Sequence, residues 1–271
     1  MPHLHVVKAH AYGNDFLLVP ESDTSGTNRA ALARAMCQRH MGIGADGLIL
    51  YTVLPDRLRM QLYNADGSAS EISGNGVRCL AAYARERNLM SAVPGHSHDV
   101  TIETPAGVAS LHLVDRAGDR WVFRAMMGTP TDIRQLELDV AGEKVTVVAL
   151  SVGNPQCLVL GPLDERRLHV LGPALEHHAA FPHRTNVAFV EVQSTRRIRI
   201  LIWERGVGPT AASGTGACGS AVAAIRYGGA ERTLEVESPG GVQRVEWHDD
   251  GLYLTGWAEI LMEGLWLAEF A

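Results

Sequence analysis

A glycine-rich motif occurs twice in this chain of 271 residues. Ser73-Gly-Asn-Gly-Val-Arg-Cys79 has a near copy in Ser213-Gly-Thr-Gly-Ala-Cys218, and the two serines are 213 − 73 = 140 positions apart. Gly13-Asn14 and Gly153-Asn154 repeat with the same offset, as do the apolar runs at 58–63 and 198–203. A constant offset over so much of the chain indicates an internal duplication. We therefore expect two similar halves that face one site.

Short apolar or alternating runs dominate both halves and predict strands. The segments after the two motifs, 76–84 and 216–225, are small and apolar on nearly every side, which is typical of buried helices. These patterns predict an α/β (α+β) protein of two pseudo-symmetric halves, each a mixed sheet rolled around a central helix. The expected N-terminal half is 1–117, with 262–271 returning to it, and the C-terminal half is 118–261.

Weaker patterns predict one more helix in each half. Thr27–His40 has an N-cap candidate before an alanine-rich run, and Asp164–Leu171 with Pro173–His178 is its weaker counterpart.

The composition excludes several classes of partner. The chain is 46% hydrophobic and 20% charged with a formal net charge of −6, so nothing favours nucleic acid or an anionic membrane. Its start lacks a basic segment followed by a long apolar run, and no stretch approaches the roughly 18 apolar residues of a spanning helix. We expect a cytoplasmic protein with a small polar substrate.

The cysteines and histidines do not form metal-binding patterns. The four cysteines lack CxxC or zinc-like spacing, so they are expected to be reduced thiols, mostly in the core. His96 and His98 lie in a polar loop, and His177-His178 lies in a helix-like segment without an HExxH pattern. Structural or solvated roles are favoured, and no metal site is expected.

A Ser-Gly-x-Gly turn that opens a buried helix creates an anion site. Its first amides have no partner within the helix, and the helix N-terminus carries about half a positive charge. Two such turns could hold a carboxylate, or stabilise the enediolate-like charge that forms when an α-proton leaves an amino acid. Ser73 and Ser213 would lie beside that charge. Helix capping alone is the alternative for a single copy, but the duplication favours a functional site.

Polar residues end the strand that precedes each motif, at 64–67 and 204–208. A surface ion pair is one interpretation of Glu204-Arg205, and recognition of α-amino and carboxylate groups is the other. The phosphate-binding pattern GxxxxGK[ST] is absent, so nucleotide binding is not favoured.

Together these motifs identify a resemblance to the diaminopimelate epimerases along essentially the full length of the chain. The wider superfamily, which includes proline racemase and phenazine-pathway isomerases, shares the fold but not the whole set of motifs. The motifs are His10-Ala-Tyr-Gly-Asn-Asp-Phe16, Gly42-Ile-Gly-Ala-Asp-Gly47, Tyr63-Asn-Ala-Asp-Gly-Ser68, the Ser73 motif, Gly153-Asn-Pro155, Arg184-Thr-Asn-Val187, Glu204-Arg-Gly206 and the Ser213 motif.

The resemblance implies a homodimeric epimerase of lysine and peptidoglycan precursor synthesis that needs no cofactor. Two opposed cysteines at helix N-termini would interconvert LL- and meso-diaminopimelate by 1,1-proton transfer. The resemblance also assigns substrate-binding residues, position by position. They are Asn14, Asn64, Asn154, Asn186, Glu204 and Arg205, with the backbone amides of Gly74, Asn75, Gly214 and Thr215 on the reacting carboxylate.

The chain departs from the family at the catalytic positions, where Ser73 and Ser213 replace the two expected cysteines. A hydroxyl is a far weaker acid than a thiol with a pKa of about 8.5, and a helix N-terminus changes a pKa by only about 1. Cys79 and Cys218 lie further along the helices, so they are not expected to substitute. Two explanations fit, namely a deliberate Cys-to-Ser pair that holds substrate without turnover, and a natural lineage in which the serines work slowly or serve another reaction.

Three hypotheses follow. The first is a diaminopimelate epimerase with Ser73 and Ser213 in the base and acid positions. The second is an isomerase or dehydratase of another amino acid on the same fold. The third is a non-catalytic amino-acid-binding homologue.

Overall fold

The computed structural model describes residues 3–89 and 99–267. The chain divides into two compact units, of which unit 1 is Met1–Ala125 with Trp257–Ala271 and unit 2 is Met126–Gly256. Residues 117 and 118, between which the sequence predicts the boundary of the two halves, lie at the turn of a β-hairpin within unit 1, where Gly118 has φ +63°. The chain passes between the units within two long strands, β8 (Arg120–Gly128) and β17 (Gly251–Trp266), so no change of composition marks the crossing.

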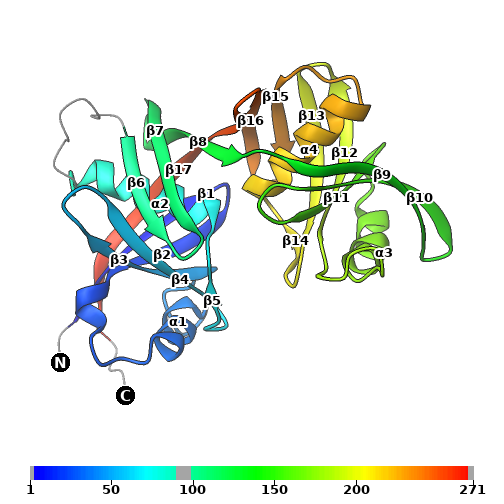
Figure 1. Ribbon diagram of the computed structural model, residues 1–271. Helices are drawn as coiled ribbons and strands as arrows, with labels where there is room; N and C mark the ends of the chain where they lie inside the picture. The colour runs from blue at the N-terminus through cyan, green and yellow to red at the C-terminus, as the bar shows by residue number, and fades with distance from the viewer. Residues whose placement is uncertain (1–2, 90–98, 268–271) are drawn as a thin grey trace. The chain divides into compact units, whose positions relative to one another are not determined.

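Unit 1 is a mixed sheet with a helix inside it (Figure 1). The sheet contains two parallel pairs, β2 with β3 and β4 with β6, among antiparallel neighbours. Its central helix α2 packs against β1, β2, β6 and β7. Besides parts of β8 and β17, the elements are β1 (Leu4–Ala11), β2 (Asn14–Pro20), η1 (Glu21–Thr24), α1 (Arg29–Cys37), β3 (Gly47–Val53), β4 (Leu58–Asn64), β5 (Ala69–Ser70), α2 (Gly74–Glu86), β6 (Asp99–Thr104) and β7 (Gly107–Ala117).

Unit 2 repeats this order of elements. Its parallel pairs, β11 with β12 and β13 with β15, correspond to those of unit 1, and its central helix α4 packs against strands β10 to β13, β15 and β16. The elements are β9 (Thr131–Val140), β10 (Glu143–Ser151), β11 (Pro155–Leu160), α3 (Glu165–Glu176), β12 (Asn186–Ser194), β13 (Arg197–Glu204), β14 (Gly208–Thr210), α4 (Gly214–Tyr227), β15 (Thr233–Ser238) and β16 (Gly241–His248). The predicted fold class is therefore confirmed.

The central helices are buried because most of their side chains are small or apolar, so the sheet can close around them. Every residue of α2 from Asn75 to Ala84 is buried, as is every residue of α4 from Gly216 to Ala224. The prediction that both helices are enclosed by strands is confirmed. Burial of this kind places each helix N-terminus at a defined point in its unit.

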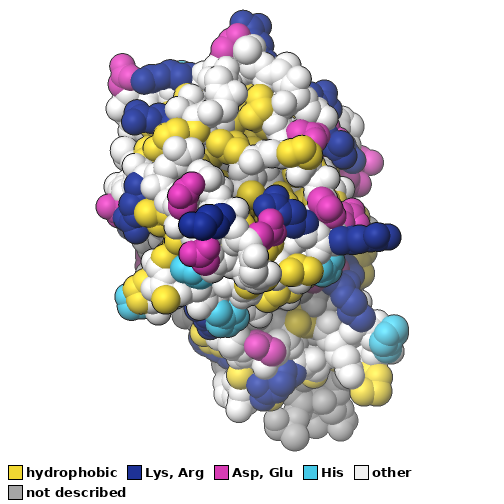
Figure 2. Space-filling view, turned by 90° about the vertical axis from the view of Figure 1, so that its right-hand side faces the viewer, with side chains coloured by type: hydrophobic (Ala, Val, Ile, Leu, Met, Phe, Trp, Pro, Cys, Tyr) yellow, Lys and Arg dark blue, Asp and Glu magenta, His cyan; other side chains and the backbone are white. Residues whose placement is uncertain are grey.

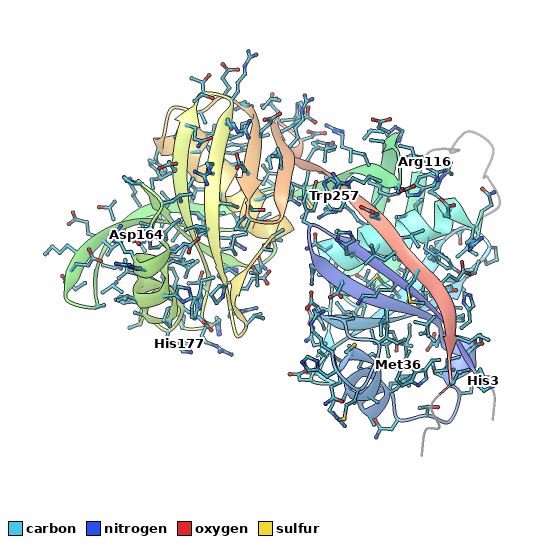
Figure 3. The ribbon with its side chains drawn as sticks, turned by 180° about the vertical axis from the view of Figure 1, so that it is seen from behind. His3, Met36, Arg116, Asp164, His177 and Trp257 are labelled. Atoms are coloured by element: carbon cyan, nitrogen blue, oxygen red, sulfur yellow. The ribbon has the colours of Figure 1, made fainter. Side chains whose placement is uncertain are left out.

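The outer helices α1 and α3 cover the sheets from the other side. Asn28 caps α1, which packs on β3 and β4, and Met36 on its inner face is fully buried. Asp164 caps α3, and Figure 3 shows Asp164 and His177 at its two ends. The two predicted segments around 164–178 form this one helix, because α3 continues through Pro173 for a further turn.

Lysine and arginine side chains are interspersed with aspartate and glutamate over the face in Figure 2. No helix within 3–89 or 99–267 is long and apolar enough to cross a membrane. The same residues contain no group of three or more His, Cys, Asp or Glu that could hold a metal, and His96 and His98 lie outside them.

Candidate active site

Both motif serines cap their helices with the same geometry. Ser73 has extended backbone angles (φ −131°, ψ 120°), and its Oγ accepts a hydrogen bond from the Gly76 amide at 3.1 Å. Ser213 (φ −142°, ψ 129°) accepts from the Gly216 amide at 3.2 Å. Capping, the alternative interpretation of the sequence, is thus observed at both positions. It uses each oxygen as an acceptor and leaves the hydroxyl hydrogen able to donate to a ligand.

The glycines of the motif allow the serines to lie close to the helix. A Cβ on Gly216 would lie 3.2 Å from Ser213 Oγ, and one on Gly76 would lie 3.0 Å from Ile49. A Cβ on Gly74 would meet nothing within 4 Å, so the tip of α2 is open beside it. The first amides of a helix have no carbonyl one turn earlier to bond. Those of Gly74, Asn75, Gly214 and Thr215 therefore form two positive cradles suited to a carboxylate.

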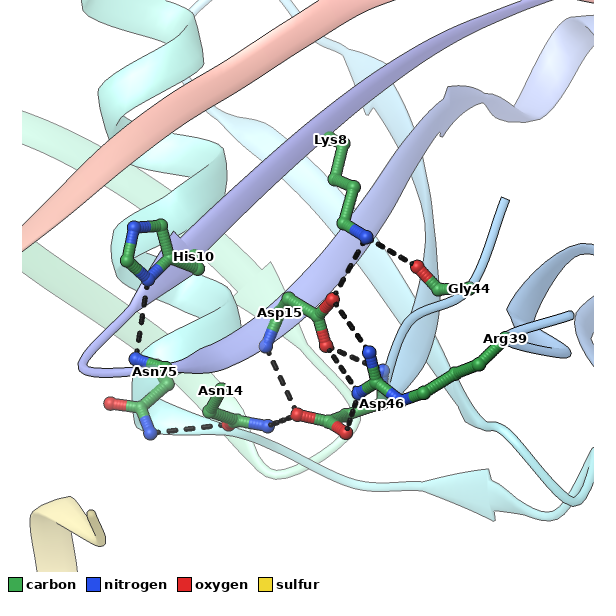
Figure 4. Close-up of polar contacts among 9 residues, drawn as sticks. Lys8, His10, Asn14, Asp15, Arg39, Gly44, Asp46 and Asn75 are labelled. Atoms are coloured by element: carbon green, nitrogen blue, oxygen red, sulfur yellow. Dashed lines mark hydrogen bonds and ion pairs between the residues drawn. The ribbon is translucent and has the colours of Figure 1, made fainter. Parts of the chain in front are cut away.

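In unit 1 a chain of hydrogen bonds holds Asn14 and Asn75 in place (Figure 4). Asn75 donates to Asn14 Oδ1 at 3.1 Å, and Asn14 donates to Asp46 Oδ2 at 2.7 Å. The buried Arg78 guanidinium donates to Asn75 Oδ1 at 2.5 Å. Each amide is therefore oriented by a charged group behind it.

Arg39 and Lys8 hold the carboxylates of this hydrogen-bond network in place. Arg39 bonds Asp15 at 2.9 Å and Asp46 at 2.7 Å, and Lys8 pairs with Asp15 at 3.0 Å while donating to Gly44 O at 2.7 Å. Burial raises the pKa of Asp15, but the bonds from Arg39 and Lys8 outweigh it and hold the pKa below its ordinary value. Asp15 is thus ionised at neutral pH, as its two basic partners require.

Asn64 lies at the same end of this sheet. It ends β4 opposite Gly47, and its side chain donates to Ser68 Oγ at 3.0 Å. The next amide, of Ala65, donates to Asp46 O at 3.0 Å. Unit 1 thus gathers Asn14, Asn64 and Asn75 around one polar corner beside Ser73.

Unit 2 repeats the central contact of this corner. Asn154 donates to Thr215 Oγ1 at 3.3 Å, and this residue pair is the Asn14–Asn75 pair displaced by 140 residues, with donor and acceptor exchanged. Gln156, which is 1% exposed, donates to Asn154 Oδ1 at 2.6 Å and orients this amide. An uncharged glutamine therefore takes the supporting role that Asp46 has in unit 1.

Asn186 connects the remaining residues of unit 2. Its Nδ2 donates to Pro155 O at 3.2 Å, and its Oδ1 accepts from the Arg205 amide at 3.0 Å. The Arg205 guanidinium is exposed and donates to His183 O at 3.0 Å. Glu204 is half-buried at the end of β13. The predicted residues Asn154, Asn186, Glu204, Arg205, Gly214 and Thr215 therefore share one end of this sheet.

Sequence reasoning missed Asp46 and Gln156 as supporting residues. Asp46 had a signal, because the 140-residue offset aligns it with Asn186, and both side chains bridge neighbouring strand ends. Gln156 aligns with Phe16 and had no such signal.

None of the four cysteines lies at the N-terminus of a central helix. All four are buried, and Cys79 and Cys218 lie inside α2 and α4 rather than at their tips. Burial raises the pKa of Cys37 to about 12, and burial also raises the pKa values of Cys79 and Cys157. Among the serines and cysteines of the two motifs, Ser73 and Ser213 are thus the residues at the helix N-termini.

A cavity of about 330 Å³ opens beside these residues on unit 2, and its lining includes Pro155, Gln156 and His183, which bond to Asn186, Asn154 and Arg205. It is not lined by Asn154, Asn186, Glu204 or Arg205. The candidate binding residues thus lie outside this hollow.

The arrangement was compared with known proteins. The family model for diaminopimelate epimerase matches residues 6–133 and 148–261. The chain belongs to the diaminopimelate epimerase family. It is 41% identical to the diaminopimelate epimerase of Desulforudis audaxviator, over 97% of this chain and 99% of that protein. It is 36% identical to the enzyme of the same name from Halothermothrix orenii, over 96% of this chain and 97% of that protein.

Solved structures share the fold of this family member at low sequence identity. A probable proline racemase from Agrobacterium radiobacter K84 has a TM-score of 0.73 at 14% identity, covering 98% of this chain and 93% of that one. A phenazine biosynthesis protein of the PhzF family from Bacillus anthracis has a TM-score of 0.69 at 15% identity, covering 99% and 100%. These two structures thus share the fold of this chain.

Proposed function

We propose that this chain is a diaminopimelate epimerase, an isomerase that interconverts the LL and meso forms by 1,1-proton transfer without pyridoxal phosphate. Family membership supports the substrate and the reaction class. The observation that carries the proposal is the duplicated helix tip, where each capping serine lies next to a hydrogen-bonded polar pair, Asn14–Asn75 in one unit and Asn154–Thr215 in the other.

The amide cradles supply the electrostatic part of the reaction. In the proposed complex the amides of Gly74, Asn75, Gly214 and Thr215 hold the carboxylate of the reacting centre. When the α-proton leaves, negative charge moves onto that carboxylate as an enediolate. Preorganised donors and two positive helix ends stabilise this charge more than that of the ground state.

The other polar residues recognise the rest of the substrate. Asn14 and Asn154 lie beside the cradles, and Asn64 and Asn186 add amide groups at the same sheet ends. Glu204 provides a carboxylate for the substrate ammonium group, and the Arg205 guanidinium suits a second substrate carboxylate. The partner is thus a small amino acid with charged groups at both ends, and we expect a homodimer, as the family resemblance implies.

Ser73 and Ser213 take the base and acid positions in this proposal. Inversion requires one group to remove the α-proton from one face and another to return a proton to the opposite face. A hydroxyl is a poor base at neutral pH, so the serine pair slows proton transfer while leaving the binding groups intact.

The serine pair also favours a second candidate, an amino-acid-binding protein without turnover. The supporting observation is that every cysteine is buried, so no thiol lies at either helix tip. Binding and proton exchange separate the two candidates.

The experiment is a calorimetric titration with diaminopimelate, paired with measurement of α-proton loss in deuterium oxide by NMR. Lysine is the control ligand, because it lacks the second carboxylate. The epimerase proposal predicts selective binding of diaminopimelate with slow exchange. Binding without exchange supports the second candidate, and no preference for diaminopimelate over lysine contradicts both the substrate and the binding residues.

A further inference from the structure

Glu176, the last residue of α3, is a buried carboxylate that the proposed mechanism does not use, with 3% of the residue exposed. Its Oε2 accepts from the Trp203 indole at 2.8 Å. Its Oε1 accepts from the Gly206 amide at 2.9 Å and from Arg184 Nη1 at 3.3 Å. Burying a charge is costly unless it is hydrogen-bonded, and here three donors converge on one carboxylate.

These donors flank the proposed recognition residues. Trp203 directly precedes Glu204, and Gly206 directly follows Arg205. One carboxylate therefore holds the chain on both sides of this dipeptide. Through Arg184, Glu176 also holds the segment that leads to Asn186. The Asn186 side chain in turn accepts from the Arg205 amide at 3.0 Å.

The backbone of α3 gives Glu176 a precise position. A Cβ on Gly172 would lie 2.8 Å from the Trp203 ring, so the helix packs against the indole without a side chain between them. His169 also meets the Trp203 ring edge-on, with 6.1 Å between ring centroids. Glu176 lies four residues after Gly172 and thus on the same helix face.

The carboxylate keeps its charge in this setting. Burial raises the pKa of Glu176, but the bonds from Trp203 and Gly206, with the charges of His177 and Arg184, outweigh it and lower the pKa below its ordinary value. An ionised carboxylate accepts hydrogen bonds more strongly than a neutral amide.

We propose that Glu176 is a positioning residue that holds the Glu204–Arg205 turn in the conformation that recognises the charged groups of the substrate. This inference rests on the proposed function for the identity of the ligand. The hold on the turn itself can be measured without ligand.

The test compares Glu176→Gln with Glu143→Gln. Glu143 accepts from Arg167 near the start of α3 at 3.3 Å, so its replacement removes another α3 ion pair away from the turn. The first readout is amide hydrogen exchange at Arg205 and Gly206, with the Trp203 indole NMR signal. A lost hydrogen bond to a charged group predicts exchange faster by about 10- to 100-fold in Glu176→Gln. Glu143→Gln should match the parent.

The second readout is the Kd for diaminopimelate, expected to rise about 10-fold or more in Glu176→Gln and to stay unchanged in Glu143→Gln. If Glu176→Gln does not fold, Trp203→Phe keeps the ring and removes one donor. It should loosen the turn in the same direction, by less.

The outcomes separate the two proposals. Unchanged exchange at Arg205 and Gly206 in a folded Glu176→Gln overturns the positioning role, and so does faster exchange with an unchanged Kd. A parent chain that does not bind diaminopimelate contradicts the proposed function, and the exchange data alone then decide whether Glu176 holds the turn.

Discussion

Ser73 and Ser213 satisfy a structural and a chemical requirement at the same atoms. Each Oγ accepts one of the amides that the helix N-terminus leaves without a partner. The same position places the hydroxyl next to the amides proposed to hold the substrate carboxylate. Different substitutions of these serines are therefore needed to separate their contribution to stability from their role in proton transfer.

Removal of either cap should destabilise the protein. Ser73→Ala and Ser213→Ala are each expected to lower the free energy of unfolding by about 1 kcal/mol, because the Gly76 or Gly216 amide loses its acceptor. Urea denaturation measures the change. Ser110→Ala, at an exposed strand position, is the control and should have little effect. Equal stability of all three variants would show that the caps contribute nothing.

The Asp15 carboxylate should make stability depend on acid pH. Its pKa is lower in the folded protein than the ordinary value, so it stabilises the fold above its unfolded-state pKa of about 4. That contribution is lost as the pH falls through the folded-state pKa. Asp15→Asn should thus be less stable than the parent at neutral pH and flatter across the acid range.

Urea denaturation at several pH values measures this difference. Asp119→Asn removes a carboxylate at an exposed turn and serves as the control. If the stability of Asp15→Asn falls at acid pH as steeply as that of the parent, other groups cause the pH dependence.

At the scale of elements, local signals predicted much of the fold. Alternation at 58–63 predicted β4, and the motif serines marked the starts of α2 and α4, because strand period and capping are encoded within a few residues. Pro173 divided the prediction for α3, since proline usually ends a helix. The bond from Gly206 to Glu176 spans 30 residues, and nothing local in the sequence indicates such a partner.

Gly172 should be essential for the packing of α3. In most helix interiors Gly→Ala is stabilising by roughly 0.5–1 kcal/mol. Here the new Cβ would meet the Trp203 ring at 2.8 Å, so Gly172→Ala is expected to destabilise by about 1–3 kcal/mol. Thermal unfolding measures the sign of the change. A higher Tm would mean that α3 can move away from Trp203 at little cost.

At the scale of the molecule, the 140-residue repeat predicted two similar units but not how the chain passes between them. β17 pairs with β16 in unit 2 and with β1 in unit 1, so one continuous strand contributes to both sheets. Alternation of apolar and polar residues identifies such a strand, but it does not show at which residue the neighbouring strands change. The sequence predicted which polar residues lie near each helix N-terminus. It did not predict the side chains that orient them, which only the structure identified.

A homodimer is the expected state in solution. The later part of β17 and the residue after it expose Leu261, Leu265 and Leu267, which are 50%, 62% and 66% exposed, and apolar surface of this kind favours association. Sedimentation equilibrium should give about twice the chain mass of 29.3 kDa. A species of 29.3 kDa at all concentrations tested would contradict this expectation.

The most direct test of the central claim is the rate of α-proton exchange into diaminopimelate in deuterium oxide, catalysed by the Ser73→Cys/Ser213→Cys double variant. If the serines occupy the base and acid positions, thiols there should raise exchange roughly 100-fold or more over the parent chain. Each single variant should gain less than the double variant. A folded double variant that binds diaminopimelate and exchanges its α-proton no faster than the parent would contradict the account.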